Sequence, residues 1–218
     1  QNPAKLTKDI KLTNWNYAPL QKAFNDLSDV SGRANLVVDL ETSGTNADEL
    51  KQNLGGHVSL IAGQADFPVE TLNIWGTGLV NTMLPGLDAG TKTQMNCAVA
   101  DFEFKDGTGA ANAFFIDTDL VTVRGQGTYA YPYDSLDMGL EPESKGLEIL
   151  DVAVPVTITG PLGNPEVSPS PAGVLKKLGG LSLGLVNPAF LAYSLTDLGL
   201  AENHPCRAYI EDAQSAEE

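Results

Sequence analysis

The chain has 218 residues, of which 42% are hydrophobic and 19% are charged. These proportions suit one large or two small globular domains and exclude a collagen, a coiled coil or a wholly disordered chain. The 13 Lys and Arg against 28 Asp and Glu give a formal net charge of −15. This charge argues against nucleic acid as a partner, because it repels phosphate backbones over most of the surface.

The first half of the chain alternates helical and strand patterns. After a short extended lead, we expect a helix, a strand, a short helix, a strand and a helix over residues 18–30, 34–42, 47–54, 57–62 and 69–84. Thr45 or Asn46 can accept the free amides of the first turn of the short helix, and Gly55-Gly56 ends that helix.

The second half reads as an antiparallel meander. Alternating residues predict strands over 92–104, 113–124, 128–140 and 151–159. Asp106-Gly107 suits a tight hairpin turn, whereas Gly125 and Gly127 are expected to break the chain between two strands. Tyr129, Tyr131 and Tyr133 are then expected to share one strand face, with Pro132 at an edge or a bulge.

The C-terminal third changes character. Four prolines between Pro161 and Pro171 predict a rigid extended connection, and the residues beyond it predict helices and a frayed end. The apolar stretch from Leu178 to Ala201 is interrupted by Gly179, Gly180, Gly184, Asn187, Pro188 and Asp197, so we expect a buried or surface-lying helical pair rather than a membrane span. No export signal or anchor is recognisable, and we expect any such segment to lie outside this chain.

The predicted fold class is therefore β-rich α+β, with six or so strands in a curved, groove-like antiparallel meander, short inserted helices and a C-terminal helical segment. We expect four parts: a lead segment and helix over 1–31, a β-rich domain over 32–160, a Pro-rich connection over 161–171 and a helical tail over 172–218.

One motif has the form of a catalytic site. Gly180–Gly184 matches a nucleophile elbow around Ser182, and Asp197 and His204 follow in the order of an α/β-hydrolase triad. An elbow needs a buried parallel strand followed by a helix, and no alternating strand-helix pattern precedes this segment. We therefore do not expect a hydrolase.

The sequence also gives no support for a metal or cofactor site. The two histidines, His57 and His204, and the two cysteines lack metal-ligand spacing. Asp101, Glu103 and Asp106 lack the spacing of a calcium loop, and Asp101 and Glu103 are interpreted as the solvent face of a strand. No phosphate loop or dinucleotide fingerprint is present. We therefore expect no enzyme, no metal and no cofactor.

Residues 32–160 contain a series of short motifs in a distinctive order. They are Ala34–Leu40 with Thr42-Ser43-Gly44, Asp48–Leu50 with Asn53–Gly56, Asn96–Phe102 with Asp106-Gly107, Asp117-Thr118 with Val121–Gly127, Leu136–Pro142, and Val154–Gly160 followed by Asn164-Pro165. This order resembles the C-terminal region of the AsmA family, envelope proteins of Gram-negative bacteria that include TamB-like and YhdP-like members. Residues 1–31 and the tail after Pro171 are not covered by these motifs.

The resemblance implies a terminal module of a larger periplasmic protein whose inner-membrane anchor and long β-groove lie outside this chain. The family is implicated in outer-membrane biogenesis, where its grooves are thought to carry phospholipid between the two membranes. The resemblance supplies no catalytic residues. An oxidising compartment also suits the two cysteines, and we predict a disulfide between Cys97 and Cys206.

The leading hypothesis is that an apolar strand face holds phospholipid acyl chains, and plain core packing is the alternative for every one of its residues. The predicted lining residues are Leu36, Val38, Leu40, Val58, Leu60, Phe102, Phe104, Phe114 and Ile116. A second hypothesis is a capping or docking domain whose tail over 174–200, starting near Lys176-Lys177, meets the membrane interface or another envelope or outer-membrane assembly protein.

Overall fold

The structure is a computed structural model in which residues 3–16, 32–68, 78–85, 92–145, 153–170 and 206–207 are described. Its elements, in chain order, are β1 Ala4–Asn16, β2 Arg33–Gly44, α1 Ala47–Gln52, β3 Gly55–Ala62, β4 Ala65–Pro68, α2 Leu79–Met83, β5 Lys92–Lys105, β6 Thr108–Thr118, β7 Val121–Ala130, the 3-10 helix η4 Tyr131–Tyr133, β8 Ser135–Ser144, β9 Val156–Gly160 and β10 Glu166–Pro169.

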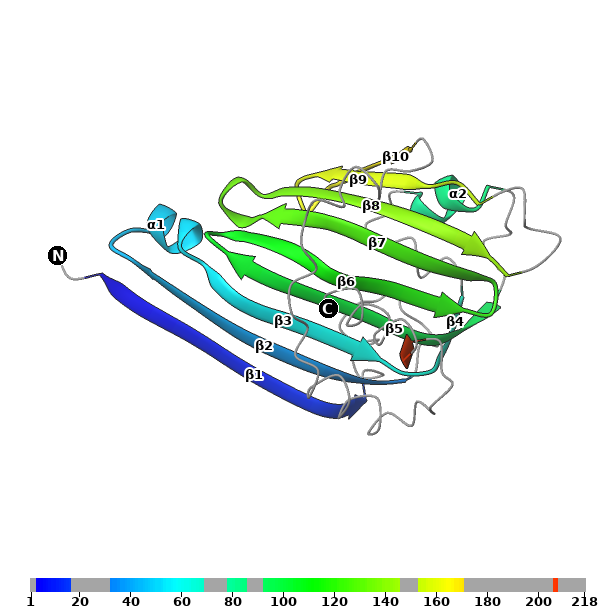
Figure 1. Cartoon of the computed structure of the whole chain (residues 1–218), viewed down its shortest axis with the longest axis horizontal. Helices are drawn as coiled ribbons and strands as arrows, with labels where there is room; N and C mark the ends of the chain where they lie inside the picture. The colour runs from blue at the N-terminus through cyan, green and yellow to red at the C-terminus, as the bar shows by residue number, and fades with distance from the viewer. Residues whose placement is uncertain are drawn as a thin grey trace, which may run out of the picture.

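These strands form one antiparallel sheet in which chain neighbours are also sheet neighbours. The order is β1-β2-β3-β5-β6-β7-β8-β9-β10, and β4 pairs with β5 just beyond the end of β3. Figure 1 shows this order as a continuous run of colour from blue β1 to yellow β10. The β-rich antiparallel meander is thus confirmed, with ten strands rather than six or so.

Local signals at two turns act as the sequence predicts. Asp106 and Gly107 have φ values of 50° and 76°, the left-handed pair that a two-residue turn between β5 and β6 requires. At the start of α1, the Asn46 side chain accepts from the Glu49 backbone N–H at 2.9 Å, while the Glu49 carboxylate accepts from the Thr45 N–H at 2.7 Å.

The N-terminal lead is itself a strand, which the sequence analysis missed. β1 pairs with β2 along nearly its whole length and forms one edge of the sheet. Most of its side chains are exposed, so it lacks the apolar alternation by which half-buried strands are recognised. The helix expected over 18–30 lies outside the described residues, and of the helix expected over 69–84 the structure describes only α2.

The expected break at Gly125 and Gly127 is wrong. The chain turns earlier, at Asp119–Leu120, and β7 runs straight through both glycines. Gly125 instead lies in a crowded part of the sheet, where a Cβ would lie 2.6 Å from the Phe114 side chain and 2.7 Å from the Leu140 side chain. Glycine therefore serves sheet packing at this position and not a turn.

Three further expectations are corrected. Tyr131 and Tyr133 do not share a strand face with Tyr129, because they lie in η4, which reverses the chain between β7 and β8 with Pro132 at its centre. The last predicted strand begins at Val156, and residues 151–152 lie outside the described part. The proline-rich connection over 161–171 contains β10, which pairs with β9 as an edge strand, where proline is tolerated.

Candidate functional site

One side of the sheet carries apolar side chains on every strand from β2 to β9 along the main path of the sheet. Side chains that face each other across antiparallel strands lie on the same side, and Leu36 pairs with Leu60, Val58 with Phe102, and Ala100 with Phe114. This side is termed the apolar face. The register places on it all nine predicted lining residues: Leu36, Val38, Leu40, Val58, Leu60, Phe102, Phe104, Phe114 and Ile116.

Burial of the apolar face falls from one end of the sheet to the other. On β8 and β9, Leu140 and Val156 are buried, with exposures of 5% and 0%. On β2 and β3, Leu36, Val38, Leu40 and Val58 are half-buried, and Leu60 is 37% exposed. At the β1 edge the exposure of Leu6 reaches 53%. The apolar face is therefore closed at its β7–β9 end and partly open at its β1–β3 end.

Helix α2 contributes to closing the buried end. Leu79, Met83 and the following Leu84 pack against apolar side chains of β7, β8 and β9. The backbone N–H of Val154 donates to the carbonyl of Met83 at 2.8 Å, which ties this helix to the chain that leads into β9. Both observations place α2 over the apolar face.

The packing of α2 leaves a cavity of about 130 Å³ beneath it. Its lining includes Leu79 and Met83 from the helix, and Val123, Leu140 and Ile158 from the sheet. Two predicted lining residues, Phe114 and Ile116, also border it. A cavity of similar size lined by apolar side chains is large enough to hold a benzene molecule, so this one can hold a short apolar group.

The opposite face carries a buried polar cluster. His57 Nε2 lies 2.7 Å from Asp101 Oδ2, and Asn112 Nδ2 donates to Asp101 Oδ1 at 3.2 Å. Asp101 is completely buried, so its interpretation as a solvent-facing residue is wrong, whereas Glu103 is exposed as expected. The hydrogen bond to Asp101 raises the pKa of His57 most; burial opposes this, and the charges of Asp101, Glu103 and Asp39 reinforce it.

A second buried carboxylate lies on the same side. Asp117 Oδ1 accepts from Lys145 Nζ at 2.7 Å and from the Thr122 hydroxyl at 2.8 Å, and Oδ2 accepts from the Asn96 amide at 2.8 Å. Burial by itself raises the pKa of Asp117, but these donors outweigh it and hold the pKa below its ordinary value. The sequence analysis did not single out this cluster.

The structure contains the disulfide between Cys97 and Cys206. The two residues are 109 positions apart, their Cα atoms are 6.2 Å apart, and both side chains are fully buried. Cys97 pairs with Asp117 in the β5–β6 register and therefore lies on the face opposite the apolar one. The bond thus attaches a C-terminal residue to the middle of the sheet.

Several predicted features fall outside the described residues, namely the elbow around Ser182 with Asp197 and His204, and the tail over 174–200. Within the described ranges, no group of three or more His, Cys, Asp or Glu side chains is arranged to hold a metal ion. In the same part of the chain, no helix has the length and apolar character needed to cross a membrane.

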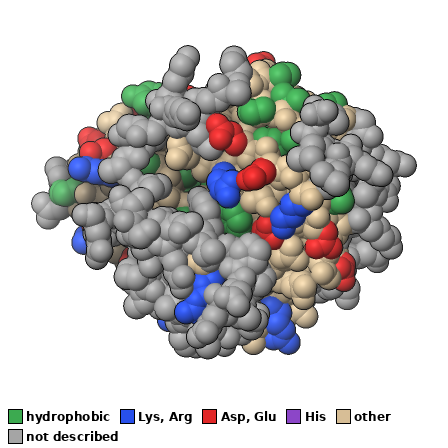
Figure 2. All heavy atoms as spheres, turned by 45° about the vertical axis from the view of Figure 1, so that its right-hand side comes forward, with side chains coloured by type: hydrophobic (Ala, Val, Ile, Leu, Met, Phe, Trp, Pro, Cys, Tyr) green, Lys and Arg blue, Asp and Glu red, His purple; other side chains and the backbone are tan. Residues whose placement is uncertain are grey.

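The charged side chains on one side of the molecule are mixed in sign. On the side of the molecule drawn in Figure 2, Lys and Arg side chains are interspersed with Asp and Glu rather than gathered into one basic patch.

Comparison with characterised sequences gives one informative relative. The chain is 24% identical over 213 residues to the AsmA family protein YhjG of Escherichia coli (strain K12). The match supports membership of the AsmA family. It covers 96% of this chain but 31% of YhjG, so the chain spans about a third of its AsmA relative. No family model and no solved structure matches the chain.

Proposed function

We propose that this chain is a non-enzymatic module of an AsmA-like envelope protein, that it works in the periplasm, and that its apolar face holds phospholipid acyl chains during outer-membrane biogenesis. The observation that carries the proposal is the apolar face, which is partly open at β2 and β3 and leads toward the cavity beneath α2. The family relationship supports the envelope context, and the disulfide suits an oxidising compartment.

The partial exposure of this face favours a bound ligand over core packing alone. A face that serves only as core is normally buried throughout, whereas Leu60, with two strands on one side and six on the other, remains 37% exposed. An acyl chain that packs on Leu60 and its neighbours on this face removes that surface from water.

The expected affinity suits transfer rather than storage. Each buried methylene contributes ~0.8 kcal/mol, so about six methylenes of one chain contribute roughly 5 kcal/mol before the cost of association. The cavity under α2 can take the end of such a chain, while the polar headgroup remains at the edge of the sheet.

Native mass spectrometry of the chain purified without detergent tests the proposal. We expect co-purified phospholipid on the parent protein and a strong reduction in the variant Leu60→Glu, which places a charge on the apolar face. The matched control is Leu162→Glu, because Leu162 has a similar exposure of 41% but lies in the turn between β9 and β10.

A parent protein that carries no lipid, and that acquires none from phospholipid vesicles, would contradict acyl-chain binding. Equal lipid occupancy in both Glu variants would contradict the location on the apolar face. The absence of lipid would favour the alternative of a docking module that binds an envelope protein or the membrane interface through residues 174–200.

A further inference from the structure

A lysine interrupts the apolar face at its open end. In the β1–β2 register Lys8 pairs with Leu40, and Ile10, two positions further along β1, pairs with Val38. Lys8 therefore lies on the apolar side of β1, between Leu6 and Ile10, and its side chain is exposed. Among the positions that the described strands β1, β2 and β3 place on this side, Lys8 is the one that carries a charge.

The ammonium of Lys8 has no acidic partner within the described part of the chain. The neighbouring lysines of β1, Lys5 and Lys11, lie on the opposite side of the sheet by alternation, and Lys5 Nζ pairs there with Glu41 Oε2 at 3.1 Å. No ion pair among the described residues includes Lys8. Its charge is therefore available to a ligand that lies on the apolar face.

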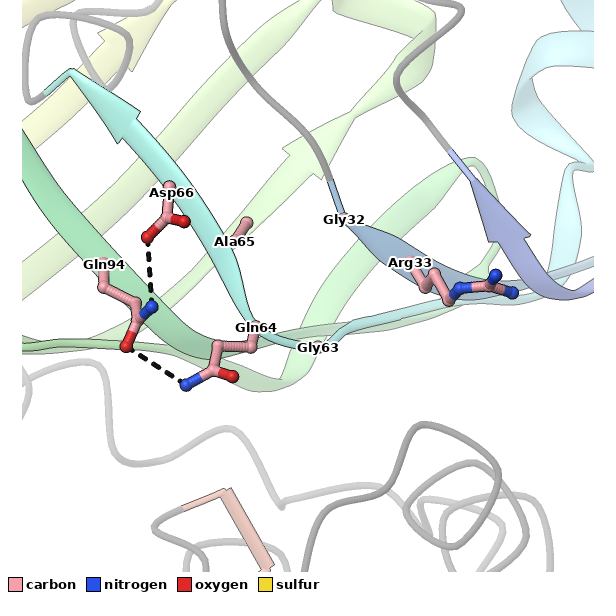
Figure 3. A pocket seen from close by; sticks show the side chains of 7 residues that line it. All are labelled: Gly32, Arg33, Gly63, Gln64, Ala65, Asp66 and Gln94. Carbon is pink, nitrogen blue, oxygen red and sulfur yellow. Dashed lines mark hydrogen bonds between the residues drawn. The ribbon is translucent and has the colours of Figure 1, made fainter.

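Arg33, another cation near this edge, is directed elsewhere. It precedes Ala34, which lies on the apolar side, so alternation places Arg33 on the opposite side. Figure 3 shows its side chain extending away from Asp66 and toward β1, where Arg33 Nη1 donates to the Asn14 carbonyl at 3.4 Å. Among the Lys and Arg residues of β1, β2 and β3, Lys8 is thus the one on the apolar side.

We propose that the Lys8 ammonium binds the phosphate of a phospholipid whose acyl chain lies on the apolar face, an inference that rests on the proposed function. The ammonium donates hydrogen bonds to the phosphate oxygens, while the methylene stem of Lys8 packs beside the acyl chain. The net charge of −15 repels anions from most of the surface, so a lysine on an otherwise uncharged face gives a phosphate a local site. This contact favours phospholipids over lipids without a charged headgroup.

The width of the sheet suits this arrangement. Three interstrand spacings of about 4.8 Å separate β1 from β5, which gives ~14 Å. The hydrocarbon of one bilayer leaflet is about 15 Å thick, so one acyl chain can extend from Lys8 across Val38 and Val58 to Phe102. These three apolar side chains are half-buried, and the next strand, β6, contributes to the lining of the cavity beneath α2.

Calorimetric titration with two single-chain probes, kept below their critical micelle concentrations, tests the role of Lys8. Lauroyl-lysophosphatidylcholine and monolauroylglycerol share the acyl chain and the glycerol, but only the first carries a phosphate. We expect Lys8→Met to lower the affinity for lysophosphatidylcholine about fivefold, the upper end for an exposed ion pair, and to leave the affinity for monolauroylglycerol unchanged. Lys8→Arg keeps the charge and should retain the parent affinity for both probes.

Lys11→Met is the matched control, because it removes the same charge from the same strand on the opposite side of the sheet, and both affinities should stay at the parent values. If both probes bind but parent and Lys8→Met bind lysophosphatidylcholine equally, the role of Lys8 is overturned and acyl-chain binding stands. Self-association of Lys8→Met with that result would show that Lys8 protects the sheet edge instead. Binding of neither probe would overturn the headgroup contact and the acyl-chain site together.

Discussion

The disulfide between Cys97 and Cys206 is predicted to supply a large part of the stability of this chain. Replacing both cysteines by alanine removes a bond that closes a loop across 109 positions of sequence. In the chain-entropy account, such a loop restricts the unfolded ensemble, and opening it raises the entropy of that ensemble. The folded sheet needs no rearrangement for this loss of stability to appear.

The expected size of the effect follows from the loop length. A loop of 109 residues gives ~4.8 kcal/mol at 25 °C, and native disulfides commonly contribute ~2–5 kcal/mol when removed. Since domains are stable by only about 5–15 kcal/mol, the double variant should lose a third or more of its free energy of unfolding. With an m-value of about 2.5 kcal/mol per molar urea, the midpoint should fall by about 2 M.

Equilibrium urea unfolding, followed by circular dichroism, measures this change. The parent chain unfolded with reductant is the matched control, because it loses the bond but keeps both sulfur atoms in place of the alanine methyl groups. Reduced parent and double variant should therefore unfold at similar midpoints, well below that of the oxidised parent. Two alkylated thiols in the unreduced parent by intact mass, or a loss of less than about 1 kcal/mol, would refute the account.

The structure also predicts the direction in which three further changes alter the stability of the protein. The pKa of His57 is raised above its ordinary 6.5, so the stability that its pairing with Asp101 contributes is fully present below about pH 6.5 and is lost as pH rises through the folded-state pKa. Replacing Asp101 by Asn (Asp101→Asn) should therefore lower the titration midpoint of His57 measured by NMR. The pKa of Asp117 is held below its ordinary 3.8, so its contribution is present above that pH and is lost as pH falls through the folded-state pKa. The variant Lys145→Met should lower the free energy of unfolding at pH 7 by about 2 kcal/mol, measured by urea unfolding. It should also raise the pH at which the contribution of Asp117 is lost. The variant Gly125→Val should lower the free energy of unfolding by about 2 kcal/mol, because the valine side chain overpacks against Phe114 and Leu140. It should also reduce lipid occupancy in native mass spectra, because these two residues line the apolar cavity.

The sequence was informative where one side of a strand is apolar and the other is not. In β2, β3 and β5 a two-residue period identified both the strand and its apolar side, although in β3 and β5 the opposite side is the more buried one. Antiparallel pairing then preserves that side from strand to strand. This is why nine residues chosen from separate strands lie together on one face even though the register itself was unknown.

The edge strands β1 and β10 were not predicted because most of their side chains are exposed to water. In β1 the residues that alternate with apolar ones include Lys5 and Lys11, and Lys8 even interrupts the apolar side. β10 contains Pro169 and only four residues. Charge and proline protect exposed sheet edges from unwanted pairing, so the features that make these strands suitable edges also remove the pattern of a strand.

The buried carboxylates were missed for a different reason. Alternation separates the two sides of a strand, but it does not show whether the polar side meets water or protein. Asp101 is buried and contacts His57, which is 44 residues away in sequence and reaches it across the β3–β5 pair. No spacing rule connects two such residues, and only the strand register brings them together.

The direction of burial along the apolar face limits how an acyl chain can bind there. Leu60 lies on the partly open side, whereas Phe114 and Ile116 border the cavity beneath α2, so one row of side chains passes from a wet to a dry environment. A flexible chain gains most by placing its terminal methyl in the dry end, since each further methylene buried adds ~0.8 kcal/mol. Under the proposed function the headgroup therefore lies toward β1–β3 and the methyl end toward α2. A photoreactive group at the end of an acyl chain should then label Met83, whereas one near the headgroup should label residues of β2 or β3, and the reverse pattern would contradict this orientation.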